Sequence, residues 1–126
     1  MSVLNSDLAD GLAARFKQLA SQLATATVLK VYDDAVDTSV ADLLYLWYKA
    51  DQSTYIQIIT AATNVIIGPL AANVPVSIGA LTSLKMLAAA STTAISTSAP
   101  STADVKQVYI GNYSGSTCNF EFWGLN

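Results

Sequence analysis

Three aspartates, Asp33, Asp34 and Asp37, form the acidic cluster of the sequence. Grouped carboxylates offer the hard oxygen ligands that calcium prefers. Their spacing lacks the alternating ligands, the glycine and the terminal glutamate of an EF-hand loop. Aspartates in turns also accept hydrogen bonds from nearby backbone amides. The spacing therefore favours a solvated turn, and we expect no metal ion.

The segment 117–123 holds the single cysteine, Cys118, and the single glutamate, Glu121. Cys118 shares one face of a period-two pattern with Phe120 and Phe122, which predicts a small buried core residue. Glu121 falls on the opposite face, so we expect it to point outward or into a subunit contact. Glycoside hydrolysis needs a second carboxylate across a cleft, and none stands out.

The sequence contains no histidine. This excludes imidazole acid–base catalysis, Ser-His-Asp triads and histidine-ligated metals. No other nucleophile–base pair stands out. Six basic residues in a chain of net charge −3 do not form a nucleic-acid footprint. We expect a protein that is not an enzyme, uses no cofactor and binds no nucleic acid.

The aromatic residues Tyr45, Trp47 and Tyr48 lie in the β-prone segment 43–48, which is apolar on both faces. A sandwich strand normally alternates apolar-in and polar-out, so the second face requires cover. An N-terminal helix or another subunit could supply that cover. A third reading is a sugar-binding platform built from Tyr45, Trp47 and Trp123.

Charged residues make up 12% of the chain and hydrophobic residues 52%, while serine and threonine supply much of the polarity. Such a neutral surface suits a protein packed among neighbours. No apolar run reaches the length of a membrane-spanning helix, and no secretory signal is visible. We expect no membrane partner and synthesis in the cytoplasm.

Segment 6–25 has helical periodicity, with Ser6 or Asp7 as the N-cap. Its apolar stripe has a heptad-like spacing: Ala9, Leu12, Phe16, Leu19, Leu23 and Ala26. The pattern predicts a helix that packs on its own domain or forms a short bundle. We therefore divide the chain into a helical segment, 1–26, and a β domain, 27–126.

The rest of the chain has the short period of β-strands. Strands are predicted at 27–32, 43–48, 54–60, 64–67, 74–78, 105–110 and 118–123. Gly68-Pro69 is expected to stop one strand, and Pro75 favours an edge position for the next. Two hairpins are expected, 43–48 with 54–60, and 105–110 with 118–123 through a glycine-containing turn. The fold class is mainly β: an antiparallel β-sandwich, with the jelly roll as one form, preceded by one N-terminal helix.

In three features the chain resembles small virion proteins of tailed bacteriophages, particularly capsid decoration, or cement, proteins and head-fibre proteins. The features are a strand ending in the acidic turn at 31–35, a charge-poor β body rich in Ser, Thr and Ala, and a C-terminal hairpin at 108–115 that returns through 120–123. The resemblance implies a non-enzymatic protein that binds assembled capsid, commonly as a trimer, and it transfers no catalytic residues.

We therefore expect a structural virion protein on the capsid exterior, whose partners are itself, as a homotrimer, and the major capsid protein or another virion protein. The alternative is a carbohydrate- or receptor-binding β-sandwich module. The residues expected at the oligomer or partner interface are Leu12, Phe16, Leu19, Leu23, Tyr45, Trp47 and Trp123.

Overall fold

The computed structural model describes residues 16–61, 64–79, 81, 85–86, 101–102 and 105–126. Ten strands and one short 3-10 helix lie in this part of the chain: β1 (Phe16–Leu23), β2 (Thr27–Asp33), η1 (Thr38–Val40), β3 (Tyr45–Ala50), β4 (Thr54–Thr60), β5 (Asn64–Leu70), β6 (Val76–Ile78), β7 (Lys85–Met86), β8 (Ser101–Thr102), β9 (Val105–Asn112) and β10 (Cys118–Leu125).

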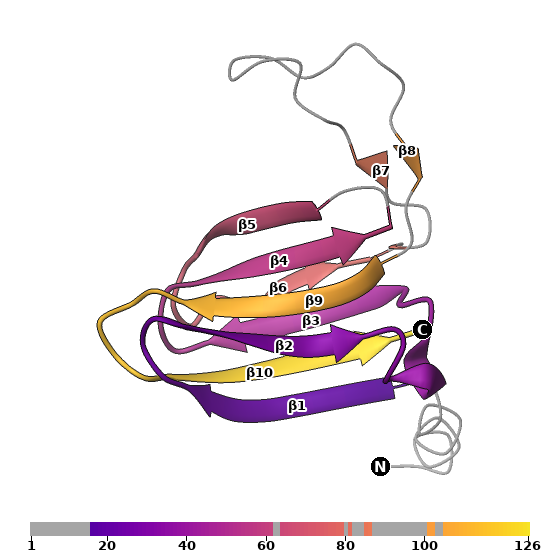
Figure 1. Ribbon diagram of the computed structural model, residues 1–126. Coiled ribbons are helices and arrows are strands. Elements are labelled where there is room, and N and C mark those ends of the chain that lie inside the picture. Colours follow the sequence, from indigo (N-terminus) through magenta and orange to yellow (C-terminus); the bar gives the residue numbers. More distant parts are fainter. Residues whose placement is uncertain (1–15, 62–63, 80, 82–84, 87–100, 103–104) are drawn as a thin grey trace.

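Eight of these strands form two four-stranded antiparallel sheets that pack as a sandwich (Figure 1). Sheet A has the order β1-β10-β3-β6, and sheet B has the order β2-β9-β4-β5. Strands β7 and β8 pair with each other in a separate ribbon. The mainly β sandwich expected from the sequence is therefore confirmed.

The alternation of side chains along each strand builds one core between the sheets. Sheet A contributes Leu46, Tyr48 and Phe122, and sheet B contributes Ile58 and Ile110, all of them buried. A buried hydrogen bond of 2.6 Å between the Tyr48 and Thr54 hydroxyls links β3 to β4 across the two layers. Cys118 and Phe120 are buried too, as their period-two pattern predicts.

The predicted N-terminal helix is wrong where the structure describes it. Residues 16–23 form β1, and all eight pair with β10, from Phe16 opposite Leu125 to Leu23 opposite Cys118. Hydrogen bonding along the whole strand outweighs the helical propensity of its Leu, Gln and Ala residues. Residues 16–23 are therefore part of sheet A. The remainder of the predicted helix, residues 6–15, lies outside the described residues.

Both predicted hairpins are also wrong. Strands β3 and β4 lie in different sheets, as do β9 and β10. Neither Gly111 nor Gly115 adopts a positive φ. Among the strands of the two large sheets, β4 and β5 are the sequence neighbours that pair directly.

Strand β5 continues through Gly68 and Pro69 to Leu70, so the predicted stop is wrong as well. Gly68 has φ of 151°, and a Cβ at this position would lie 2.6 Å from Cδ1 of Tyr55. Glycine is required here because both the backbone conformation and the ring of Tyr55 exclude a side chain. Strand β6, which follows Pro75, lies at an edge of sheet A as expected.

Candidate binding faces

The outward side chains of sheet A form an aromatic face, which consists of Phe16, Tyr45, Trp47, Trp123 and Leu125. Trp47 on β3 lies directly opposite Trp123 on β10, and Leu125 lies between Tyr45 and Phe16 on the flanking strands. All five side chains are half-buried. Because β10 is the inner strand between β1 and β3, the face runs without interruption across three strands.

The rings of the aromatic face hold one another in place. Phe16 contacts Trp123 edge to face, with ring centroids 4.7 Å apart. The indole Nε1 of Trp123 donates a 2.6 Å hydrogen bond to Oε1 of Glu121, and Nε2 of Gln18 donates to the same oxygen at 3.4 Å. These contacts fix the Trp123 ring beside a shallow hollow of about 360 Å³ that is lined by Tyr45, Trp47, Glu121, Trp123 and Leu125.

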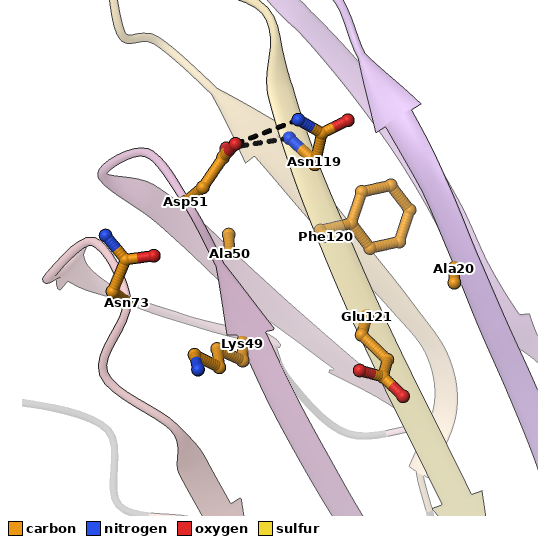
Figure 2. A pocket seen from close by; sticks show the side chains of 8 residues that line it. All are labelled: Ala20, Lys49, Ala50, Asp51, Asn73, Asn119, Phe120 and Glu121. Carbon is orange, nitrogen blue, oxygen red and sulfur yellow. Dashed lines mark hydrogen bonds between the residues drawn. The ribbon is translucent and has the colours of Figure 1, made fainter.

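A second hollow of about 250 Å³, whose lining includes Lys49, Asp51, Asn119 and Glu121, lies along the same sheet (Figure 2). Asp51 accepts hydrogen bonds from the backbone N–H of Asn119 at 2.7 Å and from its Nδ2 at 2.9 Å. These bonds lower the pKa of Asp51. Glu121 lines both hollows and therefore joins the aromatic face to its polar rim.

Lys49 and Glu121 lie directly opposite each other on β3 and β10. They do not form an ion pair, and Figure 2 shows their side chains pointing away from one another. The rim of sheet A thus presents an ammonium group and a carboxylate that are not paired with each other.

The structure brings together four of the seven residues expected at an interface: Phe16, Tyr45, Trp47 and Trp123. Leu19 and Leu23 point into the sandwich instead, where Leu23 is buried and Leu19 packs against the core. Leu12 lies outside the described residues. The structure supplies no helical cover for the aromatic face from residues 16–23, because they extend it as a strand.

Sheet B carries a second aromatic surface that the sequence analysis did not identify. This tyrosine face consists of Val28, Tyr55, Ile66, Tyr109 and Tyr113, which line a hollow of about 230 Å³ together with Gln57 and Gly111. The signal was present in the alternation of Tyr55 and Gln57 with the buried residues Ile56 and Ile58. Tyr113 could not be found in this way, since it follows the end of β9.

The acidic cluster is a structural turn, as its spacing predicts. The backbone N–H of Ala35 donates to Asp33 and that of Asp33 donates to Asp37. Each carboxylate also has a lysine partner: Lys30 for Asp33, Lys106 for Asp34 and Lys17 for Asp37. The hydrogen bond from Lys30 lowers the pKa of Asp33, and the one from the Asp42 backbone lowers the pKa of Asp34.

Within the described ranges, no group of histidine, cysteine or carboxylate side chains could hold a metal ion. Burial raises the pKa of the Cys118 thiol, which opposes formation of a reactive thiolate. In the same part of the chain, no helix has the length and apolar character needed to cross a membrane.

Comparison with protein-family models and with curated protein sequences gives no match. Among solved structures, the chain is similar to the solution NMR structure of a de novo designed double-stranded β-helix, with 10% sequence identity and a TM-score of 0.40. The match covers 86% of this chain and 97% of that one.

Proposed function

We propose that this protein is a non-enzymatic structural protein, a jelly-roll domain that associates with copies of itself through the aromatic face of sheet A. In this proposal the homo-oligomer, a trimer by the resemblance to decoration proteins, binds and stabilises an assembled phage capsid. The jelly-roll assignment is supported by the strand orders β1-β10-β3-β6 and β2-β9-β4-β5, in which successive strands mostly alternate between sheets.

The aromatic face is the observation that carries the proposal. An interface core is rich in Trp, Tyr and Phe and poor in charge, and its rim is polar. The aromatic face has this composition, and the carboxylate at its border, Glu121, already accepts hydrogen bonds from Trp123 and Gln18. Few free polar groups remain at its centre, which favours a protein partner over a sugar.

A second copy of the chain is a suitable partner because the rim carries both signs of charge. Lys49 of one copy can pair with Glu121 of another, since the two do not pair within one chain. Oligomers of this kind would present several copies of one binding surface to neighbouring capsid subunits. Detachment then requires several contacts to break together.

The first test measures molar mass by light scattering. We expect a mass that is a multiple of the 13.2 kDa chain, and a mass close to one chain for the variant Trp47→Thr, which keeps a residue suited to a strand. The matched control is Ile66→Thr, which removes an exposed apolar side chain from sheet B and should leave the mass unchanged. A wild-type protein that is a monomer at all concentrations contradicts the proposal.

Charge reversal tests the pairing between copies. Lys49→Glu should weaken association, and adding Glu121→Lys in the same chain should restore part of it. Cosedimentation with empty phage capsids then tests the virion role separately. If the protein forms an oligomer that does not bind capsids, the proposed self-association stands and the proposed capsid decoration is refuted.

A further inference from the structure

We propose that the tyrosine face of sheet B binds a neutral saccharide. This site lies on the opposite sheet from the aromatic face, so it does not depend on the proposed self-association. The inference rests on the chemistry of its lining, on the way its rings are positioned, and on its size.

The lining is neutral and carries hydrogen-bonding groups beside apolar ones. It includes the phenols of Tyr55, Tyr109 and Tyr113, the amide of Gln57, and no charged side chain. The nearby Lys30 lies opposite Tyr109, and its ammonium group is bound to Asp33 at 2.6 Å. A phenol both donates and accepts, which suits the hydroxyl groups of a sugar.

Two glycines determine where the tyrosine rings lie. A Cβ at Gly111 would lie 2.9 Å from Cε2 of Tyr113, and a Cβ at Gly68 would lie 2.6 Å from Cδ1 of Tyr55. The two rings meet edge to face, with centroids 5.6 Å apart and an interplanar angle of 73°. The glycines thus let two flat surfaces lie close to the strands, and a site formed in advance loses less entropy when it binds.

The polar groups of the site remain available. Among the described residues, the hydroxyls of Tyr55 and Tyr113 have no hydrogen-bond partner. Tyr109 donates to Gln107 at 3.2 Å, which leaves its oxygen free to accept. Gln57 uses one N–H on Asn64 at 3.4 Å and keeps its carbonyl oxygen.

The exposure and size of the site favour a small ligand. Tyr113 is 64% exposed and Ile66 is 65% exposed, so a ligand reaches both without a conformational change. The hollow measures about 230 Å³, somewhat below the roughly 300–1,000 Å³ of pockets that take drug-sized ligands, which suits a small molecule. The apolar faces of a pyranose ring match the tyrosine rings, and the sugar hydroxyls match the phenols and the amide.

The test uses the full chain and a panel of neutral and sialylated oligosaccharides. Binding is screened on an array and then measured by amide NMR titration, with the N–H groups of Gly111 and Gln57 as reporters. We expect neutral glycans to bind and to shift these two signals. Silence across the panel, or binding of sialylated glycans alone, overturns the proposal.

Variants then locate the site. Tyr113→Ala, at an exposed position, should lower affinity at least tenfold, and Gly111→Ala should lower it severalfold because its methyl displaces the Tyr113 ring. Val36→Ser, at an exposed position outside both aromatic surfaces, should leave affinity unchanged. Full binding in Tyr113→Ala would place the sugar elsewhere on the chain and refute the assignment.

Discussion

Tyr32 and Asp34 show how a few side chains stabilise the loop that follows β2. The Tyr32 ring is fully buried, and its hydroxyl lies 2.8 Å from the carbonyl oxygen of Val40 and 3.1 Å from Oδ1 of Asp34. Oδ1 of Asp34 also accepts from the backbone N–H of Asp42 at 3.0 Å. One phenol and one carboxylate thereby connect the start of the acidic turn to η1 and to Asp42, which follows it.

Replacing Tyr32 with Phe should lower the free energy of unfolding by about 1–3 kcal/mol, because the single O–H that the buried Val40 carbonyl shares with Asp34 is lost. Chemical denaturation measures the change. The control is Tyr113→Phe, whose hydroxyl is on an exposed side chain and should alter stability little. Equal stability of the two variants would show that the buried hydroxyl contributes nothing.

At this scale the sequence is informative about which side of a strand each residue occupies. The alternation of 118–123 predicted that Glu121, and with it Trp123, points outward or into a subunit contact, and Trp123 lies on the aromatic face. Segment 43–48 is apolar on both faces, so its pattern left the side of Trp47 open. Leu19 and Leu23 were assigned to the same surface on a helical period, whereas in a strand they point inward. The apolar residues of 16–23 were therefore recognised as contact residues, but their spacing was assigned to a helix and not to a strand.

Among the elements, the connection between β9 and β10 depends on the side chain of Asn112. This residue is fully buried, and its Nδ2 donates to the carbonyl oxygens of Leu23 and Ser116, both at 2.9 Å. Its Oδ1 accepts from the backbone N–H of Ser114 at 3.0 Å and from the Ser114 hydroxyl at 2.6 Å. The amide therefore holds the connection between the sheets against the end of β1.

Substitution of Asn112 tests this role. Asn112→Ala should cost about 1–3 kcal/mol of unfolding free energy, since the buried Leu23 carbonyl and the part-buried Ser116 carbonyl lose their donor. Asn112→Asp should cost more, because it directs a carboxylate at the same two oxygens. Thermal melts of the two variants give the order, and an aspartate variant as stable as the wild type would contradict it.

Substitution of Gly124 on β10 tests how tightly sheet A packs against the loop before β3. A Cβ at this position would lie 2.9 Å from Cδ1 of the buried Leu43 and 3.4 Å from Cε1 of Phe122. Gly124→Ala should therefore cost about 1–3 kcal/mol through overpacking. Gly115→Ala is the matched control, since its Cβ meets nothing within 4 Å and should leave the denaturation midpoint almost unchanged.

The pairing of strands was the part that the sequence did not predict. Local alternation identified β2, β4, β9 and β10, yet both expected hairpins failed because each short connection crosses between the sheets. Turn residues such as those at 51–53 and 113–117 permit a hairpin or a crossover equally well. The choice depends on burying both faces of the core, which is a property of the whole set of strands.

For the whole molecule, the shifted pKa values predict a stability plateau bounded on both sides. Asp33, Asp34 and Asp51 have a lowered pKa, so their contribution is present above their ordinary value of 3.8 and is lost as the pH falls below it. Burial raises the pKa of Tyr48 from 10.0 to about 12, so its contribution is lost as the pH rises from about 10 to 12.

Denaturation midpoints measured across this pH range check the prediction. Asp34→Asn should flatten the acid side, and Tyr48→Phe should flatten the alkaline side. Asp42→Asn serves as a control, because its exposed side chain makes no hydrogen bond within the described part of the chain. An acid limb that stays unchanged in Asp34→Asn would assign that limb to other groups.

The place of β10 has a consequence for biosynthesis. This strand follows all the other described strands in sequence, yet it pairs on both sides, with β1 and with β3. While residues 118–125 are still inside the ribosome, β1 and β3 have no strand between them and the core lacks Phe120 and Phe122. Sheet A is therefore completed only after synthesis has passed β10, and until then the emerging chain exposes apolar strand edges of the kind that chaperones bind.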